Sequence, residues 1–165
     1  ALIIGALGRT GSGAAAFLAQ IGVTPTAWDM AETAHGGPFP EILQHDLFIN
    51  CILAGPDTPP FVRPDAPAAD RRLTVIGDVA CDPDSSYNPV QVYNAATTWA
   101  APATRVHDAP PLDVMAIDNL PSMLPLESSE DFAAQLLPTL LDLPTDASGV
   151  WSRAAAIFTE HCDLL

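Results

Sequence analysis

The chain has 165 residues, a formal net charge of −14 and a calculated isoelectric point near 4.2. So acidic a protein repels nucleic acid and anionic membrane surfaces, and we expect neither as a partner. Apolar residues make up 48% of the chain, yet no apolar run reaches the roughly 18 residues of a membrane span. This composition favours a domain whose central elements are buried on both faces, as in a parallel sheet.

A glycine-rich turn between a predicted strand and a predicted helix is the first informative pattern. Residues 1–4 predict a buried strand, and residues 12–20 predict an alanine-rich helix. Gly5, Gly8 and Gly11 follow a GxxGxxG spacing in place of the usual GxGxxG. Such glycines permit a tight turn and the close approach of a phosphate to the helix N-terminus, although other α/β proteins also contain glycine turns. The predicted dinucleotide-binding turn comprises Gly5, Gly8, Arg9, Thr10 and Gly11.

An acidic residue follows at the distance expected for a ribose-binding carboxylate. Asp29 ends the next predicted strand, 24–29, roughly 20 residues after Gly8. A carboxylate there accepts hydrogen bonds from a ribose 2′-OH and repels a 2′-phosphate, which favours NAD over NADP. Arg9 leaves the opposite interpretation open, since a basic side chain beside Gly8 can pair with a 2′-phosphate; its other possible places are against the pyrophosphate or over the adenine. Thr33 could also bond the adenosine ribose.

Strands and helices alternate along the rest of the chain. Further strands are predicted at 46–52, 73–79 and 112–117, with short extended pieces at 90–93 and 97–99. Loops are predicted at 30–40 and 54–70, and a short helix at most at 40–45. Two later helices are predicted, one from Glu127 or Ser128 and one over 150–162 that Ser148 caps. The alternation predicts one α/β domain over residues 1–165, a Rossmann-like, doubly wound and mostly parallel sheet.

Ligands of such sheets bind beyond the carboxyl ends of the strands, so the segments after each strand are candidate site residues. Asp78, Asp82 and Asp84 crowd one of these loops. Turn capping and contact with a nicotinamide or a cationic substrate group are both open for them, and a calcium site would lack the Gly and distal Glu of an EF-hand loop. The sequence contains no HxH, HExxH, CxxC or GxSxG motif, so we expect neither a metal centre nor a serine hydrolase.

Every basic residue of the chain is an arginine, and there is no lysine. This excludes a lysine base from the segment, and with it the Tyr-x-x-x-Lys pair of short-chain dehydrogenases, which can also carry GxxGxxG. Three scattered cysteines favour free thiols in a reducing compartment, and we expect the cytoplasm. The chain has no secretory signal pattern and starts inside a strand, so we expect one domain of a longer protein.

Several stretches together resemble one enzyme family. They are residues 2–14, 28–33, 36–39, 48–52, 78–82, 88–89, 117–122, 124–125 and 136–138, with Val150, Trp151 and Ala154. In these motifs nearly the whole chain resembles the NAD-dependent, lysine-forming saccharopine dehydrogenases. The alanine dehydrogenase and transhydrogenase relatives share the architecture but less of this pattern. The resemblance implies oxidation of saccharopine at its secondary amine by hydride transfer to NAD, giving an imine that hydrolyses to lysine and 2-oxoglutarate.

The resemblance also implies roles for single residues in binding the cofactor. Gly8 and Arg9 would meet the pyrophosphate, and Asp29 and Thr33 the adenosine ribose. Leu53 stands near the adenine, where we would expect a tyrosine. The nicotinamide side would be lined by Val79, Ile117, Asp118, Asn119 and Leu120.

The rest of the active site would lie on another domain. In the resembled family the acid–base lysine and histidine belong to an N-terminal catalytic domain of the same chain, which is missing here. Residues 126–165 would form C-terminal helices that pack partly on it. A small amino-acid substrate would face this domain at Ala80, Cys81 and Asp82. Thr10 stands where some members have Cys, so we expect no disulfide to Cys51.

Two further interpretations stay open. The chain could be the NAD domain of an alanine dehydrogenase-like enzyme. It could also be a non-catalytic NAD-sensing domain.

Overall fold

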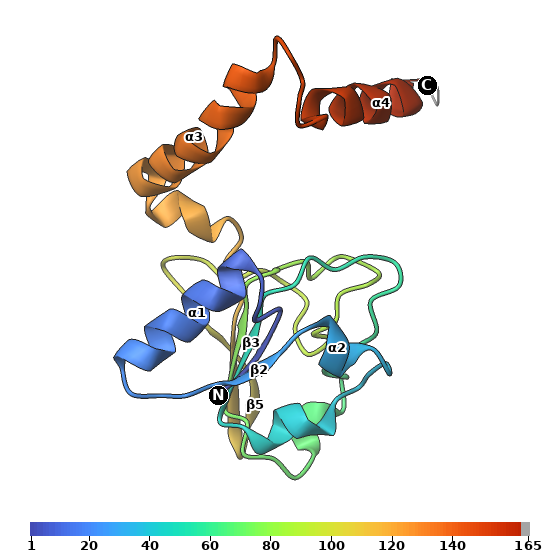
Figure 1. Cartoon of the computed structure of the whole chain (residues 1–165). Helices are drawn as coiled ribbons and strands as arrows, with labels where there is room; N and C mark the ends of the chain where they lie inside the picture. The colour runs from blue at the N-terminus through green and yellow to red at the C-terminus, as the bar shows by residue number, and fades with distance from the viewer. Residues whose placement is uncertain (163–165) are drawn as a thin grey trace. The chain divides into compact units, whose positions relative to one another are not determined.

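The computed structural model describes residues 1–162 (Figure 1). They fall into two compact units, the first Ala1–Asp118 and the second beginning at Asn119. The described strands all belong to the first unit and are β1 (Leu2–Ile4), β2 (Thr26–Trp28), β3 (Leu47–Asn50), β4 (Val75–Asp78), β5 (Thr104–Asp108) and β6 (Pro111–Met115). The helices of the first unit are α1 (Arg9–Gln20), α2 (Met30–Thr33) and the 3-10 helices η1 (Pro40–Gln44) and η2 (Ala66–Ala68). The second unit contains the 3-10 helix η3 (Leu120–Met123), α3 (Pro125–Asp142) and α4 (Val150–Cys162).

The strands of the first unit form one sheet in the order β2-β1-β3-β4-β6-β5. Every neighbouring pair is parallel except β5 with β6. Ile4, Asn50 and Asp78, which end β1, β3 and β4, stand side by side in register. The order changes direction between β1 and β3, which is the switch point where such sheets bind ligands. The predicted mostly parallel α/β sheet is confirmed.

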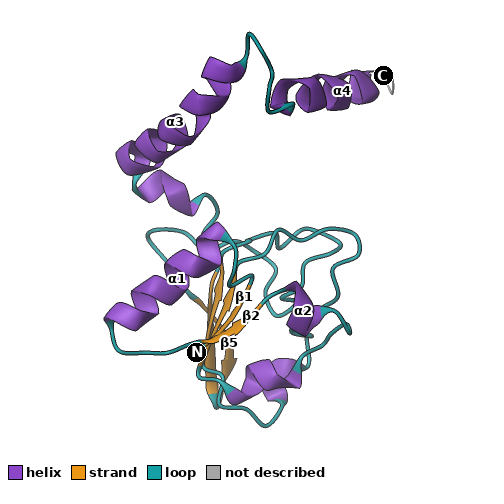
Figure 2. Cartoon of the chain, in the orientation of Figure 1, coloured by secondary structure: helices purple, strands orange, loops and turns teal. Residues whose placement is uncertain are grey.

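Alternate residues of β1 supply the two faces of the core. Ile3 packs with Leu18 of α1 on one face. Leu2 and Ile4 face the opposite side, where they join a larger cluster that includes Phe48. Figure 2 shows the sheet nearly edge-on, with α1 and α2 on opposite sides of it. Burial on both faces explains why β1 is an unbroken apolar run.

Two helices near the N-terminus differ from the prediction. α1 begins at Arg9, because the extended Gly8 is its N-cap, so the predicted phosphate turn contains the first turn of the helix. Met30–Thr33 is a helical turn where a loop was expected. Asp29 accounts for it: its carboxylate accepts a hydrogen bond from Met30 N, and Glu32 in return accepts one from Asp29 N.

The edge strand β5 was not predicted. Its sequence, Thr-Arg-Val-His-Asp, is polar, and only Val106 and His107 are half-buried. It is held by hydrogen bonds to its neighbour and by the ion pair of Arg105 with Asp113 on β6, whose Nε–Oδ1 distance is 2.6 Å. An edge strand that faces solvent needs no apolar alternation, so its sequence carries no strand signal.

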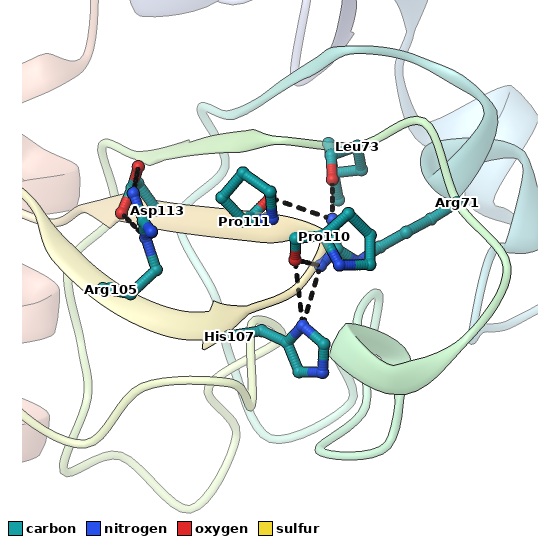
Figure 3. Close-up of polar contacts among 7 residues, drawn as sticks. All are labelled: Arg71, Leu73, Arg105, His107, Pro110, Pro111 and Asp113. Carbon is teal, nitrogen blue, oxygen red and sulfur yellow. Dashed lines mark hydrogen bonds and ion pairs between the residues drawn. The ribbon is translucent and has the colours of Figure 1, made fainter.

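The antiparallel strands β5 and β6 form a hairpin, and Arg71, in the loop that precedes β4, forms hydrogen bonds to it (Figure 3). Its guanidinium donates hydrogen bonds to the carbonyls of Leu73, Pro110 and Pro111, the last at 3.2 Å, and its Nη2 lies 3.3 Å from His107 Nδ1. Partial burial lowers the pKa of Arg71. One side chain therefore links the edge of the sheet to its interior.

The second unit is organised by two aspartates in the turn between α3 and α4. Asp142 accepts hydrogen bonds from the hydroxyl and backbone N–H of Ser148, which hold the pKa of its carboxyl well below the ordinary range. Asp146 accepts hydrogen bonds from the N–H groups of Trp151 and Ser152, so it is the main cap of α4 rather than the expected Ser148. The exposed apolar side chains of this unit include Phe132, Leu137, Leu141, Ile157 and Phe158. Within residues 1–162, no helix is both long enough and apolar enough to cross a bilayer.

Candidate functional site

Three cavities within residues 1–118 lie at the carboxyl end of the sheet. The β2-side cavity, about 410 Å³, is lined by Ile4, Asp29, Met30, Thr33, Ile52, Leu53, Gly55, Pro56, Asp57, Thr58, Pro59 and Phe61. The central cavity, about 300 Å³, is lined by Thr10, Cys51, Ile52, Leu53, Val79 and Ala80. The β4-side cavity, about 230 Å³, is lined by Cys81, Asp82, Pro83, Asp84, Ser85, Ala96 and Asp118.

The three cavities follow the order of the strands. The β2-side and central cavities share Ile52 and Leu53 as a wall. The central and β4-side cavities are lined by consecutive residues, Ala80 and Cys81. The row therefore suits a long ligand that lies across the ends of β2, β1, β3 and β4, with the switch point near its middle.

The glycines of the first turn have different structural needs. Gly5 has a φ of +83°, and a Cβ there would lie 2.9 Å from the carbonyl of Cys51. A Cβ on Gly11 would lie 2.1 Å from Gly5 O, so this glycine lets α1 approach the turn. Gly8 is exposed, has an ordinary φ of −72°, and a Cβ there would lie 3.3 Å from Gly5 O. The fold thus requires glycine strictly at Gly5 and Gly11, whereas at Gly8 a Cβ would make one tight contact, which a small shift of Gly5 O would relieve.

Asp29 joins the glycine turn to the end of β2. Its Oδ2 accepts a hydrogen bond from Leu7 N and its Oδ1 one from Met30 N, both at 2.9 Å. Thr33 donates its hydroxyl hydrogen to Asp29 O at 3.0 Å. Both side chains are half-buried and line the β2-side cavity, as the prediction of a shared ribose site requires. The capping box adds a third hydrogen bond to the carboxylate, from the backbone N–H of Glu32, so about one of its roughly four acceptor sites is left for a ligand.

Two large apolar side chains stand exposed around the same cavity. Leu53 is 94% exposed and Met30 is 82% exposed. They lie in the walls that Asp29 and Thr33 share. Apolar side chains beside convergent polar groups are typical of ligand sites. Leu53 was a predicted site residue, whereas Met30 was not, and its position directly after Asp29 is the signal that could have found it.

The loop after β4 turns its residues in different directions. Asp82 and Asp84 are exposed and line the β4-side cavity with Asp118. Asp78, grouped with the first two in the sequence, is fully buried beneath the cavities. Cys81 lies at the rim but donates its thiol hydrogen to Ala116 O at 3.0 Å, and burial, reinforced by the charge of Asp118, raises its pKa to about 11. The thiol therefore stays protonated and unreactive near neutral pH.

The remaining predicted site residues divide between the two units. Val79 and Ala80 line the central cavity and Asp118 the β4-side cavity, whereas Ile117 is buried and lines neither. Asn119 and Leu120 belong to the second unit, where Asn119 has the left-handed φ of 62° that precedes η3.

The central cavity also brings Thr10 and Cys51 to one wall. Cys51 is a free thiol, and burial raises its pKa to about 11. Within residues 1–162, no three His, Cys, Asp or Glu side chains gather in an arrangement that could hold a metal ion.

No protein-family model matches the chain. Over 167 aligned residues it is 47% identical to the saccharopine dehydrogenase [NAD(+), L-lysine-forming] of Candida albicans, covering 97% of this chain and 44% of that protein. The enzyme of the same name from Yarrowia lipolytica is also 47% identical, over 97% of this chain and 45% of its own length. The Schizosaccharomyces pombe enzyme is 42% identical, over 95% and 45%. The chain is homologous to part of the lysine-forming saccharopine dehydrogenases.

The match extends across the glycine turn, the cavities and both described units. The chain nevertheless spans less than half the length of these saccharopine dehydrogenases. The predicted family resemblance is thus confirmed for the segment in hand.

Proposed function

We propose that the chain is the NAD-binding segment of an enzyme that oxidises saccharopine to lysine and 2-oxoglutarate. The observation that carries the proposal is the row of three cavities along the carboxyl ends of the strands, next to a glycine turn. The names of the related enzymes supply the cofactor and the reaction. The free thiols of the described chain are compatible with a reducing compartment, and we propose the cytoplasm.

Each part of the dinucleotide has a matching place in the row. Residues Gly8–Gly11 would hold the pyrophosphate at the N-terminus of α1, whose first turn contains no acidic residue. Gly8 fits this role because its exposed backbone, with a φ of −72°, stands at the N-terminus of α1 without a side chain to cover it. Asp29 and Thr33 would bind the adenosine ribose beside Leu53. Within the first unit, the nicotinamide end would lie toward Val79 in the central cavity and Asp118 in the β4-side cavity.

The chain's own contribution to the reaction is placement and charge. NAD, when bound, accepts the hydride from the carbon beside the substrate's secondary amine. Ala80, Cys81 and Asp82 would form this side of the substrate site, with the exposed carboxylates of Asp82 and Asp118 favouring a cationic amine there. Because the segment contains no lysine and the β4-side cavity no histidine, we propose that the amine proton goes to a base outside this segment. We assign that base to the N-terminal catalytic domain of the parent protein.

The full-length parent protein provides the test. It should reduce NAD when given saccharopine, with release of 2-oxoglutarate, and should be much less active with alanine. Activity with alanine in place of saccharopine would favour an alanine dehydrogenase-like enzyme. NAD binding without turnover of either amino acid would favour a sensing role, and absence of NAD binding would refute the proposal.

A further inference from the structure

A buried hydrogen-bond network lies beneath the candidate site. Asp78 ends β4, Asn50 ends β3 beside it, and the exposed fraction of both is 0%. The Asp78 carboxylate accepts hydrogen bonds from Asn50 Nδ2 at 2.9 Å and from the Tyr93 hydroxyl at 2.7 Å. Burial of a carboxylate is costly, and an apolar side chain would fill a sheet interior without that cost. A carboxylate at this position therefore indicates a task other than packing.

The same carboxylate reaches the loop that carries the expected substrate residues. Cys81 N donates to Asp78 Oδ1 at 3.4 Å, while Cys81 Sγ donates to Ala116 O at 3.0 Å. Cys81 has a φ of 48°, a left-handed conformation that non-glycine residues rarely adopt. Such a conformation persists only where its surroundings hold it. Asp78, which ends β4, and Ala116, which follows β6, both hold Cys81, and the next residue, Asp82, lines the β4-side cavity.

The neighbours of Asp78 are oriented toward it. Asn50 Oδ1 is buried without a hydrogen-bond partner among the described residues, although Asn50 Nδ2 is bonded to Asp78. An unpaired buried acceptor is unfavourable, so the amide is turned to serve the carboxylate. Burial raises the pKa of Tyr93, which keeps its hydroxyl protonated and donating. Asp78 is thus the acceptor around which the network is built.

We propose that Asp78 is a positioning residue: through the backbone of Cys81 it fixes the loop Val79–Asp82 against the substrate and the cofactor. Asp78 is not among the residues that line the three cavities, so it acts through the loop and not by contact. The inference rests on the proposed function, in which Asp82 faces the substrate.

The kinetic test uses the full-length parent protein and two variants of the network. Asp78→Asn and Tyr93→Phe should raise KM for saccharopine, by about tenfold for Asp78→Asn and less for Tyr93→Phe, with kcat changed less than about threefold. Val114→Ala is the control, because Val114 is equally buried on β6 but makes no polar contact. It should lower the unfolding temperature and leave KM unchanged. If the network variants lose stability as the control does, with KM at the wild-type value, the proposal is overturned.

A second measurement separates this inference from the proposed function. Amide hydrogen exchange of residues 79–84 should speed up in both network variants of the parent and stay at the wild-type rate in Val114→Ala. If the wild-type parent does not oxidise saccharopine, the proposed function fails, and the exchange rates alone decide whether Asp78 fixes the loop. Unchanged exchange in this loop refutes the positioning role even in an active enzyme. Should Asp78→Asn not fold, Tyr93→Phe, which keeps the carboxylate, carries both tests.

Discussion

Asp29 combines a structural and a proposed ligand role in one carboxylate. It caps α2, accepts a hydrogen bond from Leu7 N and lines the β2-side cavity. We predict that Asp29→Ala in the parent protein narrows the preference for NAD over NADP, because each lost hydrogen bond to the charged acceptor costs roughly 1.5–3 kcal/mol. The ratio of kcat/KM for the two cofactors measures the effect.

Asp57 provides a matched control for this prediction, since it is a carboxylate on another wall of the same cavity. We expect Asp57→Ala to leave the ratio of kcat/KM for NAD and NADP near the wild-type value, because Asp57 is not placed to bind the ribose. If Asp57→Ala changes that ratio as much as Asp29→Ala does, the negative charge of the cavity and not the position of Asp29 sets the cofactor preference. Equal use of NADP by the wild-type protein would contradict the assignment of Asp29.

Gly8 and Gly11 allow ligand binding and folding to be tested separately. Gly8→Val should weaken NAD binding strongly while the protein stays folded, because the added side chain enters the proposed pyrophosphate space and its Cβ makes one tight contact within the fold, 3.3 Å from Gly5 O. Gly11→Ala should instead destabilise the protein, since its Cβ would lie 2.1 Å from Gly5 O. Calorimetric NAD titration and thermal unfolding of both variants give the two readouts. If the Gly8→Val protein is folded and binds NAD with wild-type affinity, the pyrophosphate does not bind at this turn.

The glycine turn and the position of Asp29 beside it could be predicted, because glycine spacing and an acid at a fixed distance are local signals. The ligand roles of these residues stay predictions. The place of Asp78 could not, because Asp78, Asp82 and Asp84 look alike in the sequence and only the end of β4 decides which one turns inward. The capping role of Asp29 was missed because the same residue type serves a ribose and a helix N-terminus equally well.

Among the secondary-structure elements, the β5–β6 edge of the sheet should lose the most stability when the hydrogen bonds of Arg71 are removed. Arg71→Lys should lower the free energy of unfolding by about 2 kcal/mol, because one ammonium cannot reach the carbonyls of Leu73, Pro110 and Pro111 together. Urea unfolding of the variant checks this.

The neighbouring Arg72 is the control, because it forms an exposed pair with Asp46 at 2.9 Å. Arg72→Lys should change the free energy of unfolding by less than about 0.5 kcal/mol. Equal effects of the two substitutions would mean that the Arg71 contacts add nothing to the hairpin.

The buried strands β1, β3 and β4 and the edge strand β2 were predicted, whereas the polar edge strand β5 was not, for one physical reason. β1, β3 and β4 must be apolar because they are covered, whereas β5 needs only backbone partners and a few charges such as Arg105. Hydrophobic patterning therefore finds the interior of a sheet better than its edges.

For the whole molecule, we expect this segment to bind the cofactor and another domain of the parent protein to supply the acid–base residues. The segment contains no lysine, so we expect it to offer the cofactor platform while the other domain supplies the amine base. Residues 1–165 alone should bind NAD weakly and catalyse nothing. Turnover of saccharopine by the purified segment, followed as NADH absorbance, would disprove this. The exposed Ile157 and Phe158 should bind a hydrophobic dye in the segment and be shielded in the parent.

The boundary between Asp118 and Asn119 separates a compact first unit from the later helices, which is a natural cutting point for protein engineering. The whole ladder of the sheet and all lining residues of the three cavities precede it. Residues 1–118 could therefore be transplanted as a cassette into another scaffold, or be followed by a different second unit. Expressed alone, this cassette should give dispersed NMR amide signals typical of a folded sheet, and a collapsed spectrum would show that the later helices are needed to build it.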